Sequence, residues 1–255
     1  MRFSVVIPAR FASTRLPGKP LLDIAGKAMV VRVAERALAS SAENVVVATD
    51  DARVLDALAT TPAAAVMTRD DHPTGSDRVM EVVELQGWAD DDVVVNVQGD
   101  EPLIPPTVID QVAGLLRDGS CGVATLYEPI TRGEDVFDPN IVKVVVNRAG
   151  RALYFSRAPI PWWRDGFSAS DVPDIANVGT GWKRHIGIYA FRVAALREFV
   201  HWPPSPSEET EALEQLRLLD HDRAIAVAEA AAPVPGGVDT EADAARVRTM
   251  LATGD

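Results

Sequence analysis

The stretch FSVVIPA at residues 3–9 is a short, continuous apolar run that ends close to a proline. Two runs of the same kind follow it, NVVVATD at residues 44–50 and DVVVNV at residues 92–97. Valine-rich runs of this length are typical of strands buried on both faces, as in a parallel sheet. Amphipathic stretches predict helices at residues 29–40, 51–60, 77–86 and 106–116. Strands that alternate with helices of about ten residues predict an α/β fold with an open sheet.

The pattern changes after residue 120, where helices become rare. Strands are expected at residues 122–128, 141–147, 152–156 and 185–192, which predicts an antiparallel extension or a small lobe. The proline-rich segment PPSPS at residues 203–207 presents Ser207 as the N-cap of a helix over residues 208–219. A strand at residues 225–229 and a helix at 241–251, capped by Thr240, complete the chain. We predict one domain over residues 1–255, with a smaller inserted lobe at residues 122–200.

The charge balance excludes several classes of partner. There are 25 Lys+Arg against 37 Asp+Glu, so the net charge is 25 − 37 = −12, which argues against a broad basic face for nucleic acid or an anionic membrane. No apolar run approaches the ~20 residues that span a bilayer, and the N-terminal run is too short for a signal peptide. The single cysteine, Cys121, permits no internal disulfide and no cysteine-based zinc site. We therefore expect a soluble protein of the cytoplasm.

Three cations lie close together in this acidic chain. Arg10, Arg15 and Lys19 follow the first predicted strand directly, at the sheet edge where ligands of open α/β sheets bind. Arginine forks and a lysine point charge suit the oxygens of a polyphosphate. The alternative is a solvated loop whose cations offset nearby carboxylates. The glycine patterns of Walker and dinucleotide-binding loops are both absent.

Two acidic positions are candidates for a metal site. Asp100 lies in QGDEP at residues 98–102, just after a predicted buried strand, and Gly99 beside it lets the backbone approach a ligand. A carboxylate at this edge suits Mg²⁺, which binds one or two carboxylates together with phosphate oxygens and water. A second acid is expected from a distant loop, and Asp239 in PGGVDT at residues 235–240 offers one. The alternatives are a capping carboxylate at Asp100 and a turn residue at Asp239.

A polar loop enters the third predicted helix. The segment MTRDDHPTGSDR at residues 67–78 carries hydroxyls, a glycine and Arg78, which can recognise a base edge and a ribose. The alternative is an ordinary helix start at Ser76.

Several longer motifs occur in order along the whole chain. They are IPARFASTRLPGKPL at residues 7–21, VATDD at 47–51, VNVQGDEPLIP at 95–105, NIVKVV at 140–145, ALYFSRAPIP at 152–161, RHIGIYAFR at 184–192, EALEQLRLL at 211–219 and GVDTEAD at 237–243. With these motifs the chain resembles the CMP-sugar-acid synthetases, specifically the 3-deoxy-manno-octulosonate (Kdo) cytidylyltransferase family. The resemblance implies an open, mostly parallel twisted sheet of the nucleotidyltransferase (Rossmann-like) type with a small, partly antiparallel lobe.

The resemblance also implies an activity and its residues. CMP would pass from CTP to Kdo for lipopolysaccharide biosynthesis, with Mg²⁺ on Asp100 and Asp239 and a homodimer formed through the smaller lobe, which would also bind the acceptor. Arg10, Arg15, Lys19 and Asp100 would be catalytic. The nucleotide would contact Pro8, Ala9, Arg10, Ser13, Arg15, Lys19, Thr74, Gly75, Ser76, Arg78, Gln98, Gly99 and Asp100. The acceptor would contact Arg78, Gln98, Arg157, His185, Tyr189, Glu214 and Gln215.

Two other functions remain open on the sequence. The stretch PWWR at residues 161–164 departs from the family pattern on the acceptor side, and arginines greatly outnumber lysines, which suggests a GC-rich genome. CMP could therefore pass to another acidic acceptor, such as an 8-amino sugar acid or a phosphonate like phosphonoformate. A nucleotide-binding regulator without catalytic activity is the second alternative, although the cationic loop and both aspartates argue against it.

Overall fold

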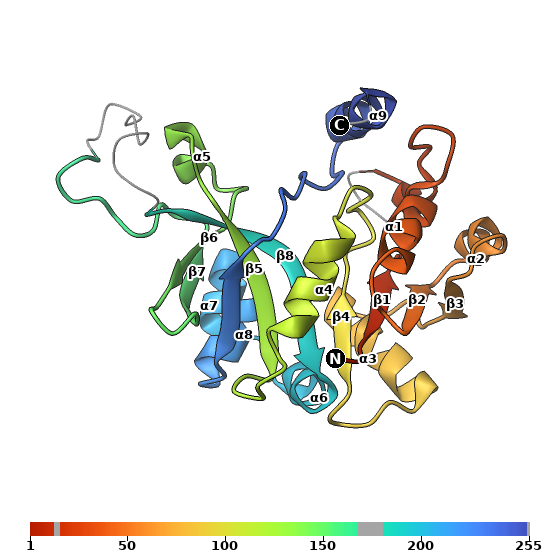
Figure 1. The fold of residues 1–255 in the computed structure, drawn as a ribbon, viewed down its shortest axis with the longest axis horizontal. Coiled ribbons are helices and arrows are strands. Elements are labelled where there is room, and N and C mark those ends of the chain that lie inside the picture. The colour runs from red at the N-terminus through yellow and green to blue at the C-terminus, as the bar shows by residue number, and fades with distance from the viewer. Residues whose placement is uncertain (13–15, 168–180, 254–255) are drawn as a thin grey trace.

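A computed structural model describes residues 1–12, 16–167 and 181–253 (Figure 1). Nine strands of this described part form one sheet, in the order β3-β2-β1-β4-β8-β5-β9, with β6 and β7 attached beside β8. The strands are β1 (Ser4–Pro8), β2 (Asn44–Thr49), β3 (Ala64–Met67), β4 (Val93–Asn96), β5 (Val123–Pro129), β6 (Lys143–Val146), β7 (Ala152–Ser156), β8 (Lys183–Arg192) and β9 (Ile225–Glu229). The predicted strands are confirmed, and β3 is an addition that the sequence did not reveal.

The sheet is mainly parallel along this path. β1 pairs in parallel with both β2 and β4, and β2 pairs in parallel with β3. β8 runs antiparallel to β4 and to β5, and the parallel direction resumes between β5 and β9. β6 and β7 form an antiparallel hairpin against β8. The predicted fold class, an open and mostly parallel α/β sheet with a small antiparallel part, is therefore confirmed. The roles predicted for the smaller lobe, acceptor binding and dimerisation, stay predictions.

Helices cover both faces of the sheet (Figure 1). Their bounds are η1 (Lys19–Leu21), α1 (Met29–Leu38), α2 (Ala52–Leu58), α3 (Gly75–Gln86), α4 (Pro106–Gly114), α5 (Gly133–Phe137), α6 (Val193–His201), α7 (Pro206–Glu211), α8 (Gln215–Asp220) and α9 (Glu241–Thr253). Side chains alternate along the strands: Val5 and Ile7 join the core under α1 and α4, and Val6 joins the core under α3 and α6. Burial on both faces explains why the strands read as continuous valine runs. No helix among the described residues combines the length and the apolar character needed to cross a membrane.

Two sequence-based helix boundaries need correction. The single helix expected over residues 208–219 is wrong, because α7 and α8 are separated by Ala212, whose φ of 50° lies in the left-handed region. The N-cap of α7 is Ser205 and not Ser207, since the Ser205 hydroxyl accepts the Glu208 amide and the Glu208 carboxylate accepts the Ser205 amide. The cap at Thr240 is confirmed, with the Asp243 amide 3.2 Å from the Thr240 hydroxyl.

Candidate active site

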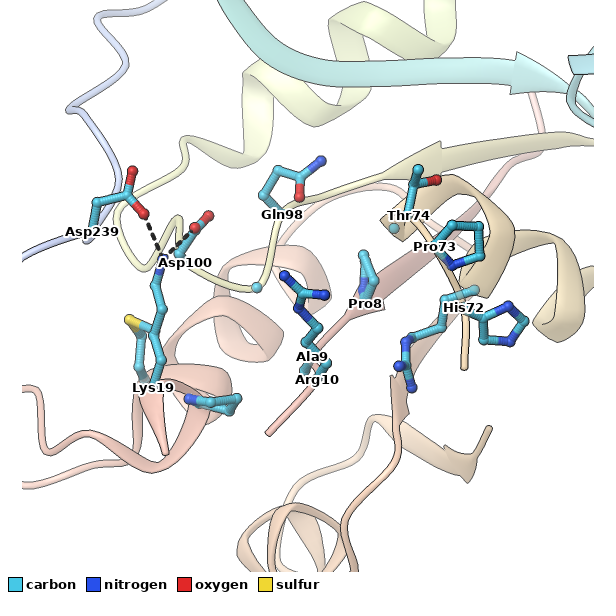
Figure 2. A pocket seen from close by; sticks show the side chains of 15 residues that line it. Pro8, Ala9, Arg10, Lys19, His72, Pro73, Thr74, Gln98, Asp100 and Asp239 are labelled. Carbon is cyan, nitrogen blue, oxygen red and sulfur yellow. Dashed lines mark hydrogen bonds and ion pairs between the residues drawn. The ribbon is translucent and has the colours of Figure 1, made fainter. Parts of the chain in front are cut away.

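A pocket of about 300 Å³ opens at the carboxyl ends of β1 and β4. Each wall comes from a segment that follows a strand or precedes a helix, which is where ligands bind in open α/β sheets. Figure 2 shows Arg10 and Gln98 between the Asp100–Asp239 pair and the loop that carries Thr74. The lining residues are Pro8, Ala9, Arg10, Lys19, Pro20, Met29, His72, Pro73, Thr74, Gly75, Arg78, Gln98, Gly99, Asp100 and Asp239.

Gly99 allows two strand ends to meet at the floor of the pocket. A Cβ atom at this position would lie 2.7 Å from the Pro8 carbonyl oxygen, a distance that real Cβ atoms do not adopt. The neighbour is backbone and cannot swing aside. The glycine in the QGDEP motif therefore lets the segment after β4 pack on the end of β1.

Lys19 joins the two candidate metal ligands. Its ammonium Nζ lies 2.6 Å from Asp100 Oδ2 and 2.9 Å from Asp239 Oδ1, although these carboxylates come from loops far apart in the chain (Figure 2). Burial lowers the pKa of Lys19, but the attraction of Asp100 and Asp239 outweighs it, so the pKa lies above the ordinary 10.5. The pocket thus holds a permanent positive charge beside two carboxylates.

The carboxylate pair fits a hard divalent cation. Asp100 and Asp239 already converge on one positive centre, the ammonium of Lys19, and both are partly exposed. No group of three or more Asp, Glu, His or Cys residues within the described ranges makes a closed metal cage. Two carboxylates with open positions are what Mg²⁺ uses when substrate phosphates complete its coordination. These residues therefore suit Mg²⁺ better than zinc.

The loop before α3 supplies the opposite wall. The hydroxyl of Thr74 accepts the Asp77 amide at 3.4 Å, and Asp77 Oδ2 accepts the Thr74 amide at 3.1 Å, so Thr74 is the N-cap of α3. The helix start expected at Ser76 is therefore wrong by two residues. Arg78 is almost fully buried on the first turn of α3, and it contributes to the lining of the pocket.

Most of the predicted nucleotide residues line this one pocket. Ser76 does not, since its hydroxyl donates to Glu214 Oε1 at 2.8 Å, outside the lining. The predictions for Ser13 and Arg15 lie outside the described residues. The residues brought together are Pro8, Ala9, Arg10, Lys19, Thr74, Gly75, Arg78, Gln98, Gly99, Asp100 and Asp239.

Sequence reasoning missed some of the lining. Pro20, Met29, His72 and Pro73 belong to the pocket, and the last two stand within the polar loop that had already been singled out. Glu101 was also missed as an ionisable group of interest. Burial and the neighbouring charge of Asp100 raise its pKa to about 8, and its Oε2 has no hydrogen-bond partner among the residues that the structure describes. Only the position of Glu101 directly after Asp100 in the motif could have drawn attention to it.

The predicted acceptor residues are arranged differently. Arg78 and Gln98 line the pocket, whereas Arg157, His185, Tyr189, Glu214 and Gln215 lie outside its lining. His185 Nε2 lies 2.9 Å from the Thr125 hydroxyl, and burial, followed by the charge of Arg184, lowers its pKa to about 3. Burial raises the pKa of Tyr189 and of Glu214, and the Glu214 charge adds to the shift at Tyr189. With a pKa of about 3, His185 is neutral at physiological pH.

Arg157 is held by main-chain oxygens. Its guanidinium donates to the carbonyls of Glu211 at 2.6 Å, Pro139 at 2.9 Å and Ala212 at 3.4 Å. Its backbone amide donates to the Glu211 carboxylate at 2.9 Å. In this arrangement the guanidinium ties β7 to the end of α7 and leaves few donors for another anion.

Comparisons with known proteins identify the family of this chain. The cytidylyltransferase family model matches residues 4–225. The 3-deoxy-manno-octulosonate cytidylyltransferase of Cellvibrio japonicus is 58% identical over 255 residues, 100% of either chain. That of Alcanivorax borkumensis is 56% identical over 252 residues, 98% of this chain and 99% of its own length. A solved CMP:2-keto-3-deoxy-manno-octonic acid synthetase in complex with CTP is 41% identical, with a TM-score of 0.89 and full coverage of both chains.

Proposed function

The chain belongs to the cytidylyltransferase family and is a nucleotidyltransferase, and from this premise we propose that it transfers CMP from CTP to Kdo. One observation carries the proposal. The pocket joins cations of the N-terminal loop to a carboxylate pair and to a polar helix start, which suit the phosphates, the metal ion, and the base and ribose of a nucleoside triphosphate. The names of the relatives identify Kdo as the acceptor to be tested first.

The proposed position of CTP follows the charges of the pocket. The triphosphate lies over the N-terminal loop, where Arg10 and Lys19 face its oxygens, with Arg15 as a further predicted contact. The base and ribose lie against the segment Thr74-Gly75, beside Arg78. This orientation places the α-phosphate near the middle of the pocket, close to Gln98 and Asp100.

Asp100 and Asp239 would hold Mg²⁺. When bound, the ion would neutralise phosphate charge and polarise the phosphoryl oxygens. The ammonium of Lys19 lies between the two carboxylates. Because it stands on a flexible four-carbon chain, it could turn toward phosphate oxygens instead. The lysine would thereby exchange one set of negative partners for another.

The reaction is an in-line displacement at phosphorus. The anomeric hydroxyl of Kdo forms the new O–P bond at the α-phosphorus, the bond to the bridging oxygen breaks, pyrophosphate leaves, and the hydroxyl proton passes to solvent. Negative charge grows on the leaving group, where Arg10 and Lys19 stabilise it. No covalent intermediate is required, so catalysis rests on positioning and electrostatics.

We assign the acceptor to the side of the pocket that faces β8. Gln98 and Arg78 reach the pocket, and Ser76 connects it to Glu214 through a hydrogen bond of 2.8 Å. A neutral His185 and the hydroxyl of Tyr189 suit hydrogen bonds to sugar hydroxyls. Arg157 would bind the Kdo carboxylate with the N–H groups that its three carbonyl partners leave.

A pyrophosphate-release assay tests the proposal. The purified protein is given Mg²⁺ and CTP with Kdo, an 8-amino analogue of Kdo or phosphonoformate, and then ATP, GTP or UTP with Kdo. We expect rapid release with CTP and Kdo, and the mass of CMP-Kdo in the product. If pyrophosphate were released with phosphonoformate and not with Kdo, phosphonoformate would replace Kdo as the acceptor. If the protein bound CTP but released no pyrophosphate with any nucleotide and acceptor, it would be a nucleotide-binding protein without this activity.

We also propose a homodimer in the cytoplasm. Leu153 and Tyr154 on β7 are 57% and 39% exposed, and such apolar side chains on the smaller lobe support an interface there. The use of CTP and the single buried cysteine support the compartment. Light scattering after gel filtration measures the mass, and a monomer at micromolar concentration would contradict the dimer.

A further inference from the structure

We propose that Asp50 is a positioning residue that joins the phosphate side of the nucleotide site to the base side. Asp50 follows β2 and does not line the pocket, so it is not expected to touch the nucleotide. Its two carboxylate oxygens bind two separate segments that do line the pocket. The inference rests on the proposed function, because it assigns those two segments to the two halves of CTP.

The first contact holds the base side. Arg78 Nη2 donates to Asp50 Oδ2 at 2.8 Å, and Arg78 Nη1 donates to the Thr68 hydroxyl at 2.6 Å. The side chains of Arg78 and Asp50 are only 3% and 10% exposed. A guanidinium that is buried and paired in this way has a fixed orientation, so Asp50 and Thr68 set how Arg78 meets the pocket.

The second contact holds the phosphate side. The backbone amide of Phe11 donates to Asp50 Oδ1 at 2.9 Å, at the point where the N-terminal loop leaves Arg10. The Phe11 ring also contacts α2, since the Arg53 guanidinium of that helix lies 3.7 Å from the ring centroid. Gly18 passes close to the same ring, because a Cβ atom there would lie 3.2 Å from Phe11. The chain just after Arg10 is therefore anchored at Phe11.

Both contacts use one carboxylate, and this is the basis of the inference. A shift of Asp50 by the length of a methylene group would displace the amide of Phe11 and the guanidinium of Arg78 relative to each other. The distance between the cations that meet the triphosphate and the wall that meets the base would then change. Small displacements of positioning groups are enough to reduce the rate of a reaction that depends on orientation.

The test uses Asp50→Asn and Asp50→Glu in the full chain. Asn keeps the shape without the charge, and Glu keeps the charge with a longer arm. We expect the KM for CTP to rise about tenfold in each variant. A loss of folded protein alone would lower the apparent kcat and leave the KM for CTP unchanged, so the two cases separate. If Asp50→Asn does not fold, Asp50→Glu carries the test.

Two probes separate the halves of the site. Binding of CMP and of inorganic tripolyphosphate is measured directly by isothermal titration calorimetry, and each should bind more weakly in the variants. Weakening of only one probe would overturn the bridge, because Asp50 would then serve one segment alone. Asp56→Asn on α2 is the matched control, because it makes the same chemical change at an exposed position of a neighbouring segment.

The outcome is independent of the identity of the reaction. An inactive wild-type protein would contradict the proposed function and would leave the two binding probes available. An active wild-type protein whose Asp50 variants match Asp56→Asn in the KM for CTP would overturn the role of Asp50.

Discussion

The nucleotide side and the acceptor side of this molecule hold their polar groups in different ways. On the nucleotide side, Arg10 and Asp100 follow strand ends, Lys19 begins η1, and all three line an open pocket. On the acceptor side, Arg157 and His185 are occupied by the protein itself, the first by three carbonyls and the second by a hydroxyl. The carboxyl edge of a parallel sheet presents side chains to a ligand directly, whereas groups on an antiparallel extension are packed among other elements.

The difference predicts two kinds of mutational effect. Changes on the nucleotide side should reduce catalysis with little loss of stability, because those side chains are partly exposed. Changes on the acceptor side should reduce stability as well, because they leave buried partners unsatisfied. Four experiments can break or sharpen this distinction.

Asp100→Asn should give the largest effect. Loss of one carboxylate from the proposed Mg²⁺ pair should cost several kcal/mol of transition-state stabilisation, about 10³-fold in kcat/KM. Pyrophosphate release from CTP and Kdo measures it. Asp91→Asn, an exposed position at the other end of β4, is the control. A folded Asp100→Asn protein with near-normal release would remove Asp100 from the metal site.

Lys19→Ala should lower kcat/KM by about 10²-fold through loss of phosphate stabilisation. The thermal midpoint should fall only slightly, because Lys19 pairs with carboxylates that remain partly exposed. Steady-state kinetics and a melting curve on the same sample give both numbers. An unchanged kcat/KM would exclude Lys19 from the phosphate site. A large drop in the melting temperature would contradict the expectation that changes on the nucleotide side cost little stability.

His185→Gln tests the acceptor side through pH. The folded-state pKa of His185 is about 3, below the ordinary 6.5, so the unfolded chain binds more protons between these values. The free energy of unfolding should fall as the pH drops from 6.5 toward 3, by less than about 1.4 kcal/mol per pH unit for this group. Urea titrations at several pH values measure the slope. The slope should decrease in His185→Gln, and equal slopes in both proteins would show that His185 titrates normally.

Thr74→Ala should give the smallest effect. Loss of the N-cap of α3 should destabilise the fold by about 1 kcal/mol and raise the KM for CTP a few-fold, about as expected for one weakened contact. Ser205→Ala removes a capping box of the same type from α7, away from the pocket. It should match the stability loss without the change in KM. Equal KM values in both variants would mean that Thr74 is a cap and nothing more.

The two sides also differ in how well sequence predicts them. The valine runs of β1, β2 and β4 are local signals, and the residues just after them fall at one sheet edge by geometry alone, so the pocket follows from the order of segments. β3 was missed because AAVM is short and rich in alanine.

Contacts on the acceptor side are not local. The break between α7 and α8 depends on a left-handed Ala212, a conformation that alanine itself does not favour. Ser76 meets Glu214, and Arg157 meets Glu211, across long stretches of chain. Hydrophobic periodicity does not reveal such pairs, so the acceptor residues could be predicted only from the family resemblance. Their roles stay predictions.

The three carbonyls around Lys143 bear on which substitutions the chain can accept. Lys143 is fully buried, and its Nζ donates to the carbonyls of Asp138 at 2.9 Å, Ile141 at 2.6 Å and Arg157 at 2.6 Å. Three acceptors that converge on one atom match a tetrahedral ammonium, and a flat guanidinium is too large and points its N–H groups outward. The chain has 21 arginines and only four lysines. Replacement of Lys143 by arginine is nevertheless not expected to be tolerated at this position.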